Sequence, residues 1–112
     1  MQAKANVWIE CDGQVALSRW RVALLLAVHE TGSISAAAQR LGIPYHRAWD
    51  KIRECEQRLG ISLLTTQTGG SGGGGARLTP AAIDYVQRFQ RFECGLDELI
   101  QQRFQAAFGD LL

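Results

Sequence analysis

The sequence predicts a mainly α-helical domain that carries a small β-sheet. Apolar residues recur at helical spacing through most of the chain, glycines separate these stretches, and six of the residues between 69 and 75 are glycine. With 112 residues the chain can bury one core but is too short for two full domains. Its 46% apolar and 21% charged residues are typical of a globular protein. We therefore expect a single domain.

The first predicted elements are a short β-hairpin and a helix. Asp12-Gly13 separates two short apolar stretches within residues 6–17, which is the signature of a tight hairpin turn. Ser18 is a typical helix N-cap, and the helix that follows is predicted to run to about Glu30 before Gly32 ends it. This helix is apolar on most sides, so we expect it at the centre of the core.

Residues 33–60 predict two helices joined by a tight turn. Ser33 can cap a short first helix, and Gly42 can end it in the left-handed conformation. Pro44 suits the first turn of a longer second helix, which ends at Gly60. This arrangement is a helix-turn-helix, although the spacing alone is equally compatible with an ordinary helical hairpin.

Residues 61–79 predict a β-hairpin, because strand-like flanks surround the glycine cluster. A hairpin directly after a helix-turn-helix is a wing, so residues 1–79 are predicted to form a winged helix-turn-helix with the glycines at its flexible tip. The glycines also satisfy the G-x-G-x-x-G pattern of dinucleotide sites. That alternative is disfavoured, because strand-like residues 76–79 separate the glycines from the next helix and too little chain remains for a parallel sheet.

Residues 80–112 predict a long C-terminal dimerisation helix within the same domain. Thr79-Pro80 is a helix start, and apolar residues at three-to-four spacing continue to about Phe108. Such a helix is roughly 40 Å long and outruns a compact domain, so its distal half needs a partner. An antiparallel homodimer is the economical solution. Gly95 marks a close crossing, a kink or a division into two helices. The predicted dimer residues are Ile83, Val86, Phe89, Leu96, Leu99, Ile100 and Phe104.

The second helix of the helix-turn-helix is the predicted DNA-reading element, because the N-terminal residues of this helix enter the major groove. Arg47 is suited to donate two hydrogen bonds to guanine, and Asp50 is suited to accept one from the amino group of cytosine. For Arg47 the alternative is a side chain that is solvated or contacts only a phosphate. For Asp50 the favoured alternative is an ion pair with Arg47, Lys51 or Arg53 on the same helix. Trp49 is expected to pack beneath the wing. The predicted DNA-contacting residues are Ser33, Ser35, Tyr45, His46, Arg47, Asp50, Lys51, Arg53, Thr68, Gly69, Ser71 and Arg77.

Charge is unevenly distributed, although the net charge is only +1. Residues 33–77 contain six basic and three acidic side chains, a net of +3, whereas residues 80–112 contain three basic and five acidic ones, a net of −2. In a dimer the basic patches double, which is enough for modest attraction to phosphates.

No motif indicates an enzyme, a cofactor or a metal site. Cys11, Cys55 and Cys94 lie far apart and lack zinc spacing, and Cys55 lies on the buried stripe of its helix as a core residue. Catalytic Ser/His/Asp sets and paired carboxylates are also missing. Because the sequence has neither an 18-residue apolar run nor a signal-like start, we expect a cytoplasmic protein without a membrane segment.

Four motifs in one order give a family resemblance. They are Gly-Ser-Ile-Ser at 32–35, Gly-Ile-Pro-Tyr at 42–45, Ala-Trp-Asp-Lys-Ile at 48–52 and Thr-Gly-Gly-Ser-Gly-Gly-Gly-Gly-Ala at 68–76. Over about residues 7–108 the chain resembles the N-terminal DNA-binding domain of ModE-type molybdate-responsive transcription regulators, relatives of the LysR helix-turn-helix. The resemblance implies a sequence-specific transcription regulator that binds double-stranded operator DNA as a homodimer joined largely through its terminal helices.

The sequence departs from the ModE pattern in three respects. ModE proteins usually continue into paired molybdate-binding modules, whereas this sequence stops at Leu112. We expect any signal either to come from outside the chain, with a separate effector-binding protein as one alternative, or to act on the DNA-binding domain itself. Ser71 and His46 stand where the family commonly has lysine, which reduces the expected attraction to phosphate. A winged helix used for protein contact therefore remains the rival hypothesis.

Overall fold

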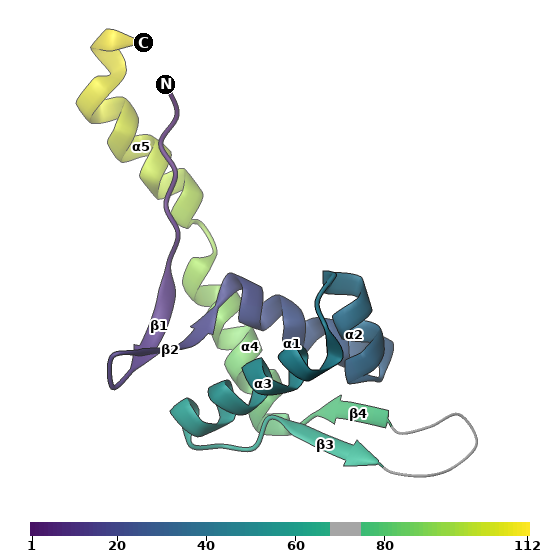
Figure 1. Cartoon of the computed structure of the whole chain (residues 1–112). Helices are drawn as coiled ribbons and strands as arrows, with labels where there is room; N and C mark the ends of the chain where they lie inside the picture. The colour runs from purple at the N-terminus through teal and green to yellow at the C-terminus, as the bar shows by residue number, and fades with distance from the viewer. Residues whose placement is uncertain (68–74) are drawn as a thin grey trace.

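The computed structural model describes residues 1–67 and 75–112. Four helices and two small hairpins form the body of the molecule, and a fifth helix projects from it, so that the protein measures 63 × 28 × 21 Å (Figure 1). The mainly α-helical fold with a wing is as the sequence predicts. In chain order the elements are β1 (Trp8–Cys11), β2 (Gln14–Ser18), α1 (Arg19–Thr31), α2 (Ile34–Leu41), α3 (Tyr45–Leu59), β3 (Leu64–Gln67), β4 (Gly75–Leu78), α4 (Pro80–Glu93), α5 (Leu96–Phe108) and the 3-10 turn η1 (Gly109–Leu111).

The first hairpin turns where the sequence predicts it. Asp12 and Gly13 both have positive φ, at 52° and 77°, which matches the twist of the two flanking antiparallel strands. A bulge between Ile9 and Glu10 shifts the register of the two strands, and the side chain of Ile9 packs against the core. The hairpin therefore packs on the body of the molecule next to the start of α1.

Helix α1 is the centre of the core, as predicted. The Ser18 hydroxyl accepts a hydrogen bond from Arg21 N, and Gly32 ends the helix with a φ of 78°. The helix contacts α2, α3 and α4 as well as strands β2 and β4. Its residues Leu24 and Val28 are almost completely buried, so each neighbouring element packs on a different side of one apolar helix.

The C-terminal helical segment is divided at Gly95, one of the outcomes that the sequence left open. Gly95 has a φ of 81°, so the chain leaves α4 and begins α5 in a new direction. Among the described parts of the chain, none of the residues of α5 is buried. The N-terminal segment runs beside α5, and Gln101 Nε2 donates a 2.8 Å hydrogen bond to the Ala3 carbonyl oxygen (Figure 1).

Val86 and Phe89, two of the predicted dimer residues, lie away from the protomer surface. Both side chains are buried in the core of a single protomer, and Ile83 packs partly against the same core. The apolar stripe of the C-terminal segment therefore serves two purposes: its α4 half completes the protomer, and its α5 half lies outside it. In the described ranges no helix is long and apolar enough to span a membrane.

Candidate nucleic-acid interface

Helices α2 and α3 form a helix-turn-helix closed by two caps. At the start of α2, Ser33 Oγ accepts a 3.0 Å hydrogen bond from Ala36 N, and at its end Gly42 has a φ of 69°. Pro44 lies immediately before α3 in the extended conformation, rather than inside its first turn as predicted. Its carbonyl oxygen still accepts from Arg47 N, so the proline fixes the direction in which α3 leaves the turn.

A buried arginine attaches one side of α3 to α1. Arg21 is only 8% exposed, and its guanidinium donates to the Lys51 carbonyl oxygen at 3.3 Å, to Cys55 Sγ at 3.4 Å and to Glu54 Oε2 at 2.9 Å. The hydrogen bond from Arg21 lowers the pKa of Glu54, and burial raises the pKa of the Cys55 thiol. Arg21 could not be identified from the sequence, because it lies within an otherwise apolar helix and its partners are 30 to 34 residues away.

Glu54 also holds two cations of its own helix. Its Oε2 lies 3.5 Å from Lys51 Nζ and 3.7 Å from the Arg58 guanidinium. Arg58 in turn donates to the Val15 carbonyl oxygen at 2.7 Å, which joins α3 to the first hairpin. Of the predicted DNA contacts, Lys51 therefore lies on the flank that faces α1, where a carboxylate already attracts its charge.

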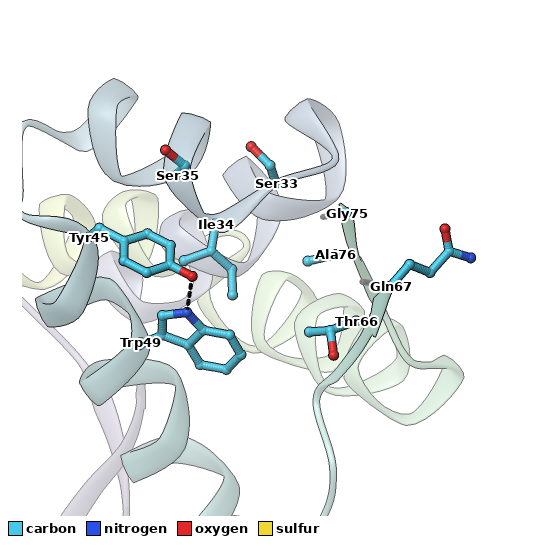
Figure 2. A pocket seen from close by; sticks show the side chains of 9 residues that line it. All are labelled: Ser33, Ile34, Ser35, Tyr45, Trp49, Thr66, Gln67, Gly75 and Ala76. Atoms are coloured by element: carbon cyan, nitrogen blue, oxygen red, sulfur yellow. Dashed lines mark hydrogen bonds between the residues drawn. The ribbon is translucent and has the colours of Figure 1, made fainter. Parts of the chain in front are cut away.

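The opposite flank of α3 carries an aromatic pair beside the wing. Trp49 Nε1 donates a 2.5 Å hydrogen bond to Tyr45 Oη (Figure 2). The Arg53 guanidinium carbon lies 5.1 Å from the centre of the Trp49 ring. Trp49 is partly buried and packs against the core, in agreement with its predicted packing role. A cavity of about 440 Å³ lies between this flank and the wing; it is lined by Ser33, Ile34, Ser35, Tyr45, Trp49, Thr66, Gln67, Gly75 and Ala76.

The outer face of α3 exposes four of the six α3 residues that are predicted to contact DNA. His46, Arg47, Asp50 and Arg53 are all exposed. The favoured ion pair of Asp50 with Arg47, Lys51 or Arg53 is not formed among these described residues. Lys51 is drawn to Glu54 and Arg53 lies over Trp49, so the Asp50 carboxylate faces solvent without a cation partner among the residues described.

The wing is an antiparallel hairpin held against the helix-turn-helix. Strand β3 pairs with β4 so that Thr65 lies opposite Arg77 and Thr66 opposite Ala76. Ala76 N donates a 2.8 Å hydrogen bond to the Gly32 carbonyl oxygen, at the turn between α1 and α2. Arg77 is exposed on β4, as a DNA contact requires. The predicted contacts Thr68, Gly69 and Ser71 lie outside the described residues.

Together, the capped α2–α3 pair and the attached wing define a winged helix-turn-helix. Residues 21–83, more than half of the chain, match the family model described as bacterial regulatory helix-turn-helix protein, lysR family. The chain belongs to this family of regulatory proteins. Within the part of the chain that the structure describes, no three His, Cys, Asp or Glu side chains gather where they could hold a metal ion.

Two curated relatives support the resemblance to ModE. The chain is 42% identical over 80 residues to the molybdenum-pterin-binding protein MopB of Rhodobacter capsulatus. The matched region covers 71% of this chain and 30% of MopB. The chain is 34% identical over 110 residues to the DNA-binding transcriptional dual regulator ModE of Escherichia coli (strain K12), covering 98% of this chain and 40% of ModE. The chain thus spans about a third of the length of these relatives.

Solved structures of LysR-type DNA-binding domains have the same fold. The structure titled CbnR_DBD-DNA complex has a TM-score of 0.57 and 27% identity, and covers 79% of this chain and 94% of that one. The BenM_DBD complex with catB site 1 DNA has a TM-score of 0.56 and 25% identity, with 79% and 92% covered. The match covers nearly the whole of each of these domains, so the chain is a winged helix-turn-helix of the LysR type that resembles the ModE DNA-binding region.

Proposed function

We propose that the chain binds double-stranded DNA sequence-specifically, as a homodimeric transcription regulator that acts in the cytoplasm. The observation that carries this proposal is the outer face of α3. His46, Arg47, Asp50 and Arg53 are exposed there on a helix that Arg21 of α1 and the hydrogen bond from Arg58 to the first hairpin hold on another side. An exposed polar face on the second helix of a helix-turn-helix is the surface that enters the major groove.

The relatives support the same function. ModE of E. coli is named a DNA-binding transcriptional dual regulator, and the CbnR and BenM domains are titled as complexes with DNA. The rival hypothesis, a winged helix for protein contact, rests on the small net charge and on Ser71 and His46, which stand where the family commonly has lysine. Arg47 and Arg77 are exposed and have no acidic partner within ion-pair distance among the described residues, so positive charge is available at both the helix and the wing.

The proposed dimer forms through α5. A helix of this length is marginal in water unless it packs against something, and in the protomer α5 touches mainly the N-terminal segment. Leu99 is exposed, and Leu96, Ile100 and Phe104 are only half-buried on neighbouring positions of the same helix. An antiparallel pairing of two such helices covers these four side chains and places two winged helices on one DNA duplex.

Binding to DNA is the direct test. Fluorescence anisotropy should measure Kd for the purified chain on the sequence upstream of its own gene and on an unrelated duplex, at several salt concentrations. We expect tighter binding to the upstream sequence and a linear fall of log affinity with log salt concentration. Absence of binding to both duplexes at low salt would favour the protein-contact alternative.

A charge-matched pair of variants locates the interface. Arg47→Ala removes an exposed cation from α3, and we expect weaker binding, with a salt slope smaller by about 1 if Arg47 meets a phosphate. If Arg47 reads a base instead, Arg47→Ala should cost about 1–3 kcal/mol on the preferred sequence only. Arg91→Ala removes an exposed cation from α4 and serves as the control. Equal binding by Arg47→Ala and wild type would remove Arg47 from the interface.

The signal is proposed to reach this regulator from a separate effector-binding protein. The names of the relatives point to molybdenum, and their matched regions amount to less than half of each protein. Under this proposal molybdate should leave the Kd of the purified chain for DNA unchanged. A shift in Kd on titration with sodium molybdate would instead assign sensing to the chain itself.

A further inference from the structure

We propose that Trp49 is a positioning residue that prepares Tyr45 and Arg53 to bind the phosphate backbone of DNA. This inference rests on the proposed function and deepens it, because it separates backbone contacts on one flank of α3 from base contacts on its outer face. Tyr45, Trp49 and Arg53 follow one another at intervals of four residues, so they lie along one side of the helix.

The hydrogen bond between the two aromatic side chains has only one possible direction. An indole N–H donates and cannot accept, so the Tyr45 oxygen is the acceptor in the 2.5 Å contact with Trp49 Nε1. The hydroxyl hydrogen of Tyr45 is then left to donate elsewhere. Tyr45 is 53% exposed, and among residues 1–67 and 75–112 no hydrogen bond donated by its hydroxyl is found. Trp49 thus turns this hydroxyl into an outward-facing donor.

The same indole holds a cation one turn further along α3. The Arg53 guanidinium lies over the Trp49 ring, and within the described residues it makes no ion pair. Its charge therefore stays available to an incoming anion, while the ring limits the conformations that the long side chain can adopt. Restricting a side chain before binding reduces the entropy that association must remove.

Trp49 itself is placed to support and not to bind. It is partly buried, it packs against the core, and its ring lines the cavity together with Ile34 and the wing residues Thr66 and Ala76 (Figure 2). Packing against the core and the hydrogen bond to Tyr45 fix the orientation of the ring, and the cavity separates it from the wing. The two groups that it supports are a neutral hydroxyl at the indole N–H and a cation over the face of the ring.

A phosphate oxygen is the acceptor that best fits this pair. The guanidinium requires an anion, and the hydroxyl requires an acceptor atom. The neighbouring cavity wall adds the hydroxyls of Ser33, Ser35 and Thr66 and has no carboxylate among its described lining residues. Because phosphate contacts carry no sequence information, this flank should contribute equally to binding of preferred and unrelated DNA.

Two ring-conserving variants and their combination test the inference. Tyr45→Phe removes the hydroxyl, and Trp49→Phe removes the N–H donor but keeps an aromatic ring under Arg53. We expect Tyr45→Phe to weaken binding about tenfold and Trp49→Phe about threefold, on both the preferred and the unrelated duplex. The double variant should bind no more weakly than Tyr45→Phe alone. The indole N–H of Trp49 acts on DNA binding only by orienting the Tyr45 hydroxyl, so its loss has no further effect once that hydroxyl is gone.

The salt dependence separates this role from loss of charge or of structure. The hydroxyl is neutral, so neither aromatic variant should change the salt slope, whereas Arg53→Gln should reduce it by about 1. Trp20→Phe, a change at a partly exposed tryptophan at the start of α1, is the matched control and should bind like wild type. Thermal unfolding followed by circular dichroism shows that each variant is folded.

The outcomes distinguish the inference from the proposed function. Trp49→Phe binding as tightly as wild type overturns the positioning role, as do additive losses in the double variant or losses confined to the preferred sequence. Failure of the wild-type chain to bind any duplex overturns the proposed function and, with it, this inference.

Discussion

The backbone nitrogen of Ala76 donates a 2.8 Å hydrogen bond to the carbonyl oxygen of Gly32. This bond joins the wing strand β4 to the turn between α1 and α2, immediately before the Ser33 cap. Because the Ala76 N–H points toward Gly32, it does not take part in the ladder with β3. This backbone contact, together with the packing of β4 against α1, couples the position of the wing to that of the helix-turn-helix.

Replacing Ala76 by proline should detach the wing from this turn. Proline has no N–H, so Ala76→Pro leaves the Gly32 carbonyl oxygen without its donor and brings the proline ring toward it. We expect a loss of about 1–3 kcal/mol in the free energy of unfolding, measured by urea denaturation, together with weaker DNA binding. The helix content measured by circular dichroism should remain, because β4 is not part of any helix.

The control for this prediction is Ala76→Gly, which keeps the N–H while also removing the β-carbon. It should retain DNA affinity within about twofold, at a stability cost of about 1 kcal/mol for the lost side chain and added chain entropy. If Ala76→Pro and Ala76→Gly bind DNA equally well, the hydrogen bond to Gly32 does not position the wing.

The Arg21–Glu54 pair predicts a dependence of stability on acid pH. The hydrogen bond from Arg21 holds the pKa of Glu54 below its ordinary value of 4.5, so the folded state favours the charged carboxylate more than the unfolded state does. This contribution is present above pH 4.5 and is lost as the pH falls through the lower, folded-state pKa. We expect Glu54→Gln to be less stable at neutral pH and to lose less stability on acidification than wild type.

Arg21→Met provides an independent check on the same pair. Without the arginine the largest cause of the lowered Glu54 pKa is removed, so this variant should also show a flatter acid profile. Urea denaturation of all three proteins across the acid range measures the profiles. An acid profile of Glu54→Gln that parallels wild type would mean that other groups control this part of the pH dependence.

Charge introduced on the exposed face of α5 should dissociate the proposed dimer without unfolding the protomer. We expect Ile100→Glu to give a monomer in light scattering at tens of micromolar, because an unpaired carboxylate in an apolar interface is costly. Thermal stability of the remaining fold should change little, since α5 lies outside the protomer core. DNA binding should weaken, because each winged helix then binds alone.

Gln102→Glu adds the same charge on the side of α5 away from Leu96 and Ile100, and it should stay dimeric. A wild-type chain that scatters as a monomer would contradict the interface altogether. Dissociation by both variants alike would indicate a general charge effect on α5.

Local sequence features predicted the elements well. Asp12-Gly13 specified a turn with two positive φ angles, and Ser18, Ser33 and Thr79 each cap the helix predicted for them. Such signals are readable because a cap or turn satisfies backbone groups within a few residues. The same holds for the buried stripe of α3, since helical periodicity alone places Ala48, Ile52 and Cys55 on one side.

Contacts between residues that are far apart in the chain were harder to predict from the sequence. The periodicity of the last segment identified Val86 and Phe89 as apolar positions but could not say whether a partner or the protomer covers them; the protomer does. The charge pattern around Asp50 was compatible with several ion pairs, and the choice was made by Glu54 and Trp49, which hold Lys51 and Arg53.

The sequence by itself determined the order of helices and strands, their caps and the winged helix-turn-helix, because these follow from interactions within a few residues or from helical periodicity. Tertiary structure alone decided how α3 is held. Arg21 reaches across from α1 to one flank, and on the other flank Trp49 packs against the core beside the cavity that the wing borders. These contacts join residues tens of positions apart, and packing geometry, not local propensity, selects which side chains meet.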